Sequence, residues 1–154
     1  MFYLTASIAI MTAFMVVVCR RPVHALVYLI VSLLATAMLF FLLGAHLAAA
    51  LEVIVYAGAI MMLFVFVIMI LGGRQEPISK NELLIPSCFT GTLLAELLYV
   101  LSQAGGTAHG APVGPQEVSL SLFGPYALIV EMAAFLLLAG LVGAYHIGRE
   151  EARS

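Results

Sequence analysis

The sequence predicts an all-α integral membrane protein with five transmembrane helices in a single membrane domain, residues 1–154. Hydrophobic residues make up 64% of the chain and charged residues only 9%, whereas about a quarter of the residues of a soluble domain are charged. The apolar residues form five runs, each close to the roughly 20 residues that a helix needs to cross the hydrocarbon core of a membrane. We place the five helices at 2–19, 23–43, 48–71, 83–102 and 126–147.

The ends of the first two runs carry recognisable signals. No basic segment precedes the first run, and Arg20 and Arg21 follow it, so we expect a retained helix and not a cleaved signal peptide. Pro22 opens the second run, at a position where a helix tolerates the missing N–H. Gly44 marks the end of that run.

The segment 103–125 connects the last two runs and is rich in Gly and Pro. Within it Val118, Leu120 and Leu122 alternate with two serines, a pattern that would suit a short extended piece on the outer surface. We predict a plain loop here, with the extended piece as the alternative.

The basic residues predict the orientation of the chain. Short loops rich in Lys and Arg stay in the cytoplasm. With five spans, all six basic residues fall on one side of the membrane: Arg20, Arg21, Arg74, Lys80, Arg149 and Arg153. We therefore expect the N-terminus outside and the C-terminus in the cytoplasm.

The cysteines and histidines of this chain do not form the patterns that most redox and metal sites require. Cys19 and Cys88 are far apart and form no Cys-x-x-Cys motif, so they predict neither a zinc site nor an iron–sulfur cluster. The histidines fall at helix boundaries or in connections, where solvation explains them better than haem ligation. A net charge of −2 gives no reason to expect a nucleic-acid partner. We predict no cofactor, metal or catalytic centre in this chain.

Three glutamates lie within or near the predicted hydrocarbon region: Glu52, Glu96 and Glu131. A carboxylic acid in a membrane helix is costly and is a functional candidate by default. For Glu52 and Glu131, a part in proton transfer and a structural role are equally open. For Glu96, a structural or lipid-edge role is favoured, because little else polar accompanies it.

The third run holds the densest group of candidate residues. Glu52 and Tyr56 are four residues apart, so a helix brings them to one face, where a phenol beside a carboxyl group could orient or pass a proton. Gly58 follows between Ala57 and Ala59, which makes this the thinnest and most flexible part of the run. Small residues also have an ordinary explanation, since they let neighbouring transmembrane helices approach closely.

These residues resemble a known family. The segment Glu-x-x-Val-Tyr-x-Gly-Ala-Ile at 52–60 is its most specific match. Weaker matches lie before it at 22–30 and after it at 63–66, 122–126 and 148–151, in the order of the family. The chain resembles the family of subunit J of the bacterial proton-translocating NADH–quinone oxidoreductase, respiratory complex I, the counterpart of mitochondrial chain 6. Glu96 has no counterpart in the family pattern.

The resemblance implies a place and a mechanism. Members of this family lie in the bacterial inner membrane, beside subunits A, K and H and the antiporter-like subunits, while other subunits bind NADH, FMN, iron–sulfur clusters and the quinone. Their third span carries a π-bulge, which here would cover Tyr56 to Ala59. Switching the bulge to α form would turn the following residues by about 100°. Met62, Phe64 and Phe66 would then swing relative to neighbouring subunits and couple quinone chemistry to proton translocation.

Other interpretations belong to different classes. A subunit of a related multisubunit cation/proton antiporter or of a membrane-bound hydrogenase would share this module. A purely structural scaffold would pack the membrane arm without a moving part. A self-sufficient small transporter is least favoured, because three scattered acids do not suggest a polar cavity of substrate size.

Overall fold

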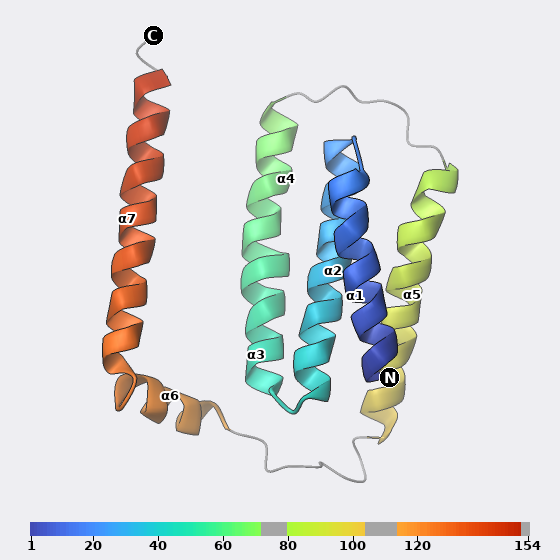
Figure 1. The fold of residues 1–154 in the computed structure, drawn as a ribbon, viewed down its shortest axis with the longest axis horizontal. Coiled ribbons are helices and arrows are strands. Elements are labelled where there is room, and N and C mark those ends of the chain that lie inside the picture. The colour runs from blue at the N-terminus through green and yellow to red at the C-terminus, as the bar shows by residue number, and fades with distance from the viewer. Residues whose placement is uncertain (72–79, 104–113, 152–154) are drawn as a thin grey trace. The chain divides into compact units, whose positions relative to one another are not determined.

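In this computed structural model the described residues are 1–71, 80–103 and 114–151, and all of their regular secondary structure is helical (Figure 1). The helices, in chain order, are α1 (Phe2–Val18), α2 (Pro22–Leu42), α3 (His46–Leu51), the π-helical segment η1 (Glu52–Ile60), α4 (Met61–Ile70), α5 (Lys80–Gln103), α6 (Pro115–Phe123) and α7 (Ala127–Glu151). The five apolar runs of the sequence are thus confirmed as helical.

Among the described residues, four helical stretches are long and apolar enough to cross a membrane, and they are Pro22–Leu42, His46–Ile70, Leu84–Ser102 and Ala127–Arg149. The first run forms a shorter apolar helix, α1, of 17 residues. Its length is about 26 Å at the usual helical rise. The structure therefore supports four candidate spans and leaves the fifth, α1, at the lower limit of span length.

The chain divides into two compact units, Met1–Pro112 and Val113–Ser154, which we describe separately. In the first unit α2 is the central helix and contacts α1, α3, η1, α4 and α5. It lies between α5 and the third helix, which consists of α3, η1 and α4 (Figure 1). The buried core consists of Ile8, Val31, Ala35 and Leu93, and Ala9, Leu34 and Phe89 pack against it. Small residues on α2 allow this close approach: Ala35 is fully buried.

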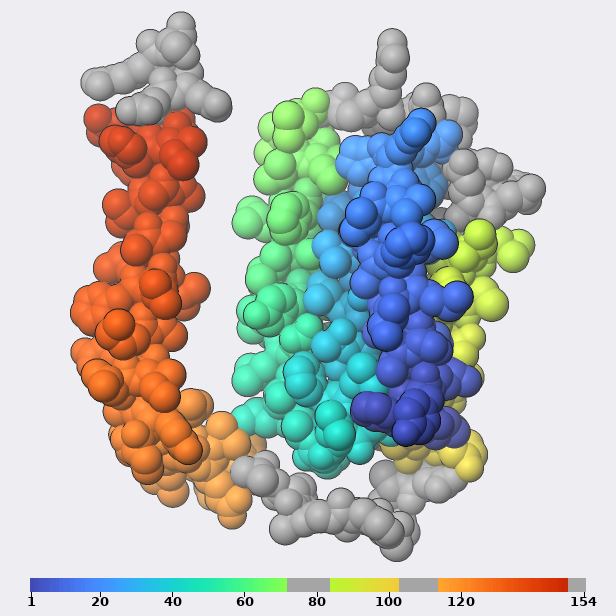
Figure 2. Space-filling model, in the orientation of Figure 1, coloured from blue at the N-terminus to red at the C-terminus, as the bar shows by residue number. Residues whose placement is uncertain are grey.

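α1 and α2 form the closest pair of helices in the first unit, and in the space-filling view the side chains of α1 cover part of α2 (Figure 2). The buried face of α1 carries Thr5, Ile8 and Thr12, which helical spacing places on one side. The Thr12 hydroxyl lies 2.7 Å from the backbone oxygen of Ile8, and the Ser32 hydroxyl donates across to Ala9 on α1. Hydrogen bonds therefore satisfy the Thr12 and Ser32 hydroxyl groups at this contact.

The corner after α2 depends on Gly44. This glycine has φ +83°, a left-handed conformation that costs a residue with a Cβ atom about 1–2 kcal/mol. The Gly44 N–H donates to the Phe41 oxygen at 3.0 Å, and the Ala45 N–H donates to the Phe40 oxygen at 2.9 Å. This pair of bonds is the Schellman arrangement that ends many helices, and it confirms the predicted helix end at Gly44.

In the second unit the predicted loop is wrong over residues 115–123, where the chain forms α6. Gly114 precedes the helix and Pro115 occupies its first turn, as helix starts prefer. The alternation of Val118, Leu120 and Leu122 forms no extended piece, because the segment is helical, and the serines between them donate back to carbonyls of that helix. Residues 104–113 lie outside the described part of the chain.

A tight corner at Gly124 joins α6 to α7. A Cβ atom on Gly124 would lie 2.7 Å from the Leu120 oxygen, so no larger residue fits without a backbone shift. α7 itself extends to Glu151, four residues beyond the predicted helix end at 147.

Candidate functional site

The third helix, which carries most of the candidate residues, is continuous from His46 to Ile70. Its three segments α3, η1 and α4 join without a break, because Leu51 has φ −65° and ψ −38° and Met61 has φ −65° and ψ −37°. Both pairs of angles are those of a right-handed helix. The change between segments is therefore a change of hydrogen-bond pattern within one rod.

The middle of this helix, η1, has π-type geometry over nine residues, Glu52–Ile60. At its end the Met61 N–H donates to the Tyr56 oxygen, five residues back along the chain, whereas an α-helix bonds to the fourth residue back. The predicted π geometry is confirmed. It begins four residues earlier than the predicted start at Tyr56 and ends one residue after Ala59.

Gly58 lies inside η1 where the backbone leaves little room for a side chain. A Cβ atom at this position would lie 3.3 Å from the Val53 oxygen, five residues back. Such a contact is tighter than most real Cβ contacts, so a larger residue would require a small shift of the Val53 carbonyl or of the helical turn. Ala57 and Ala59 flank it, so the three predicted hinge residues all belong to the π segment.

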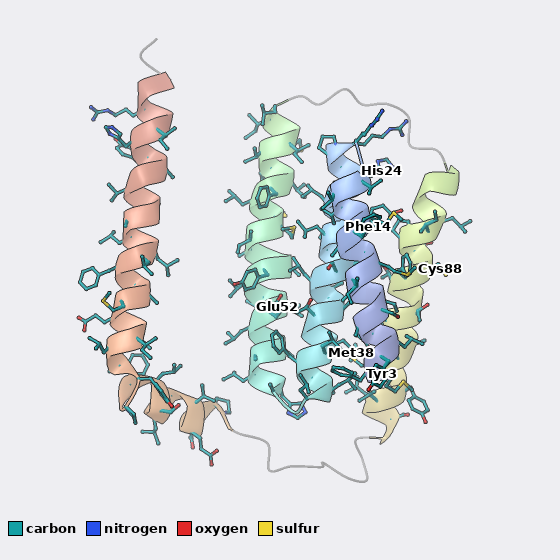
Figure 3. The ribbon with its side chains drawn as sticks, viewed as in Figure 1. Tyr3, Phe14, His24, Met38, Glu52 and Cys88 are labelled. Carbon is teal, nitrogen blue, oxygen red and sulfur yellow. The ribbon has the colours of Figure 1, made fainter. Side chains whose placement is uncertain are left out.

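Glu52 and Tyr56 both belong to η1, and Figure 3 labels Glu52 on the third helix. Glu52 is half-buried, and Tyr56 is 49% exposed. Within the described part of the chain no hydrogen bond joins the two side chains. Their pairing on one face therefore remains a prediction.

The three bulky residues predicted to move lie on or near the surface of α4. Met62, Phe64 and Phe66 are all exposed in this chain. The preceding residue, Met61, is 5% exposed instead and points into the first unit. These three side chains are thus available to lipid or to other subunits.

Glu131 belongs to the second unit, where it lies exposed on α7. Its surroundings are described only within the second unit. It stays a predicted proton-path residue.

Of the two roles that the sequence favoured for Glu96, structural and lipid-edge, its position in this chain fits only the structural one. The side chain is 5% exposed, so it is buried inside the first unit and does not lie at a lipid edge. The neighbour of Glu96 is Thr5, whose hydroxyl is 2.8 Å from the Glu96 Oε1 atom and which was not among the predicted site residues. A signal was present, because Thr5 and Thr12 are seven residues apart, a spacing that puts both on one helix face.

A cavity of about 370 Å³ lies between α2, the start of the third helix and α5. Its lining is almost entirely apolar, and the ring of His46 at its edge packs against Phe41 with a centroid distance of 4.6 Å. Across residues 1–71, 80–103 and 114–151, no group of three His, Cys, Asp or Glu side chains could hold a metal ion. The carboxyl and hydroxyl groups of Glu52 and Tyr56 are of types that can bind or pass protons.

Comparisons with known proteins show the family of this chain. The family model for NADH-ubiquinone/plastoquinone oxidoreductase chain 6 matches residues 12–147. NADH-quinone oxidoreductase subunit J of Pseudomonas aeruginosa is 48% identical, over 99% of this chain and 97% of its own length. Subunit J of Escherichia coli K12 is 48% identical over 97% and 86%, and that of Buchnera aphidicola from Schizaphis graminum is 39% identical over 97% of each chain. The chain therefore belongs to the subunit J (chain 6) family and is a membrane subunit of bacterial NADH-quinone oxidoreductase, respiratory complex I.

Proposed function

We propose that this subunit couples quinone reduction to proton translocation by a reversible change between π and α form in η1. The nine-residue π segment in the middle of a long apolar helix carries the proposal. Such segments are rare and are often found at functional sites. They can also change without breaking the helix, because only the hydrogen-bond pattern shifts.

The consequence of such a change falls on α4. Removing one residue from a turn rotates everything beyond it by about 100°. Met62, Phe64 and Phe66 are exposed in this chain, so their rotation would alter contacts with neighbouring subunits and open or close a path for water. Ala57, Gly58 and Ala59 serve as the hinge, with few side-chain atoms to hinder the turn.

Glu52, Tyr56 and Glu131 are the proton-path residues of this proposal. An acid in a membrane helix can take up and release a proton when its surroundings change. The described candidate spans, Pro22–Leu42, His46–Ile70, Leu84–Ser102 and Ala127–Arg149, offer carboxyl groups and no lysine, so partner subunits would supply the lysines that a pump needs. In the family arrangement these partners are subunits A, K and H and the antiporter-like subunits, with FMN, iron–sulfur clusters, NADH and quinone on other chains.

We also propose five spans with the N-terminus outside and the C-terminus in the cytoplasm. α1 packs along α2, and its 17 residues reach the lower limit for a span. The basic residues of the chain then lie on the cytoplasmic side.

Substitution of Gly58 tests the coupling. In a Gly58→Val complex the side chain meets the Val53 carbonyl, so we expect NADH–quinone reductase activity to fall several-fold in assembled complex, with lower proton pumping per NADH. Gly91→Val is the matched control: its Cβ atom meets nothing within 4 Å, and activity should stay near wild type.

The two variants also separate coupling from scaffolding. Normal turnover and pumping in an assembled Gly58→Val complex would refute the proposal. If Gly58→Val instead lowered only the amount of assembled complex, with full activity per complex, the subunit would be a structural scaffold.

A further inference from the structure

Two buried residues fasten the third helix to the rest of the first unit, one on each side of η1. Ala49 on α3 is 7% exposed and Met61 on α4 is 5% exposed. The structure describes every residue of His46–Ile70, and these two are the buried ones among them. Because α3, η1 and α4 all contact α2, Ala49 and Met61 lie on the side of the third helix that faces α2.

This alignment of the two residues depends on the π geometry between them. Ala49 and Met61 are twelve residues apart, and at about 100° per residue a regular α-helix would turn them about 120° away from each other. One residue inserted as a π turn removes about 100° of this rotation and leaves about 20°. Ile68, seven residues after Met61, is half-buried and continues the same side at regular α spacing.

Without the π insertion, the preceding residue would occupy each inward position. Ile60 is eleven residues after Ala49, a spacing that leaves only about 20° between them in a regular α-helix. Ile60 would therefore take the place of Met61, and Val67 would take the place of Ile68. All four exchanging side chains are apolar, so the third helix can present an apolar side to α2 in either form.

The exchange nearest the start of η1 is unequal in size. Ala57 is half-buried and lies eight residues after Ala49, so the π insertion brings it to the inward side. In the α form Tyr56 would take its place, and a phenol ring needs far more room beside α2 than a methyl group. This difference favours the π form, which is the form that the chain adopts. The α form requires that space opens beside α2.

We propose that the third helix carries two alternative sets of contact residues for α2, one for each form of η1. The set of the π form is Ala57, Met61 and Ile68, and the set of the α form is Tyr56, Ile60 and Val67. Ala49 keeps its place in both. This inference rests on the π-to-α change of the proposed function and names the residues that stabilise its two end states. Packed contacts of this kind switch between discrete arrangements, so a small displacement of a neighbour can produce a full rotation of α4.

Maps of the assembled complex from electron cryo-microscopy test the two sets without any measurement of pumping. In Met61→Gln the π form buries an amide without an assigned partner, which is unfavourable. The fraction of particles in which the side-chain density of Phe64 and Phe66 is turned by about 100° should therefore rise above that of wild type. Ile60→Gln is the matched control, because it makes the same kind of change at the adjacent residue but penalises the α form, and its particles should keep the π form.

Persistence of the π form in every particle class of Met61→Gln, or an equal rise of the α form in both variants, would overturn the proposal. Met61→Ala removes contacts of the π form without burying a polar group, so it should shift the same fraction in the same direction if Met61→Gln fails to assemble. A shifted register with normal protons pumped per NADH would support the two contact sets and refute the coupling function. The two proposals can therefore fail separately.

Discussion

α2 and the third helix are both long apolar helices of the first unit, yet they are built in opposite ways. In the most apolar 18-residue stretch of each, 28% of the α2 residues are buried, against 6% in the third helix. α2 has regular α geometry and contacts α1, the third helix and α5. The third helix contains nine residues of π geometry and presents most of its side chains outward.

The difference indicates which contacts hold each helix in place. α2 is held by neighbours within its own chain, with Ala35 fully buried among them. The third helix contacts α2 but leaves most of its side chains exposed, so we propose that lipid and other subunits also hold its conformation. A helix that is held from outside can respond to changes outside, as a coupling element must.

The largest effect is expected from overpacking α2. Ala35 is fully buried, and a Leu side chain there should cost about 3 kcal/mol because the helices must move apart. The amount of assembled complex on native gels should fall several-fold for Ala35→Leu. Ala48→Leu, at an exposed position on the third helix, should leave assembly near wild type. Equal losses in both variants would remove the contrast between the two helices.

Met61 and Met62 compare a buried and an exposed side chain on adjacent residues. Met61 is 5% exposed and Met62 is 57% exposed. Truncation of a buried Met typically costs about 2 kcal/mol or more, so Met61→Ala should lower the thermal stability of the complex. Met62→Ala should change stability by less than about 0.5 kcal/mol but reduce quinone reductase turnover if the residue takes part in gating. A thermal stability equally reduced in both variants would show that partner subunits bury Met62.

Gly44 forms the corner that separates the two helices. Ala at this position would be forced into a left-handed conformation at a cost of about 1–2 kcal/mol, so Gly44→Ala should lower the melting temperature of the complex modestly without changing protons pumped per NADH. Gly91→Ala, in a helix with open space around it, should be neutral or slightly stabilising. A changed pumping ratio in Gly44→Ala would mean that the corner itself takes part in coupling.

The smallest effect on stability is expected from the two exposed or half-buried acids. A Glu52→Gln, Glu131→Gln double variant keeps the size of both side chains, so assembly should stay within about 0.5 kcal/mol of wild type. Proton translocation per NADH, measured in reconstituted vesicles, should fall partially. A normal stoichiometry would show that both residues are structural, and Glu117→Gln serves as the matched control for removing a charge.

Much of the fold could be predicted because apolar runs and helix ends are local properties. The runs and Gly44 predicted the helices of the first unit within a few residues. The prediction failed at α6, where alternating apolar and polar residues suggested a loop or an extended piece. The serines there donate to carbonyls of their own helix, and nothing in a period-two pattern reveals that preference.

The candidate site, like the fold, could be predicted only in part. The family motif indicated a π segment, but its full length, from Glu52 to Ile60, depends on hydrogen bonds that the residue types do not specify. Glu96 was expected in a structural or lipid-edge role, because its own helix offers no clear partner. Its partner Thr5 is 91 residues away in the chain, so only packing of α5 against α1 brings the two together.

The sequence by itself determined that this chain consists mainly of apolar helices, which segments form the long ones, and which family it resembles. These properties follow from hydrophobicity, from glycine and proline at helix ends, and from a short motif, all of which act locally along the chain. Only the tertiary structure decided which helix is central, which acid is buried and which is left to outside partners. Burial depends on what packs against a side chain, and in this chain those neighbours come from distant segments.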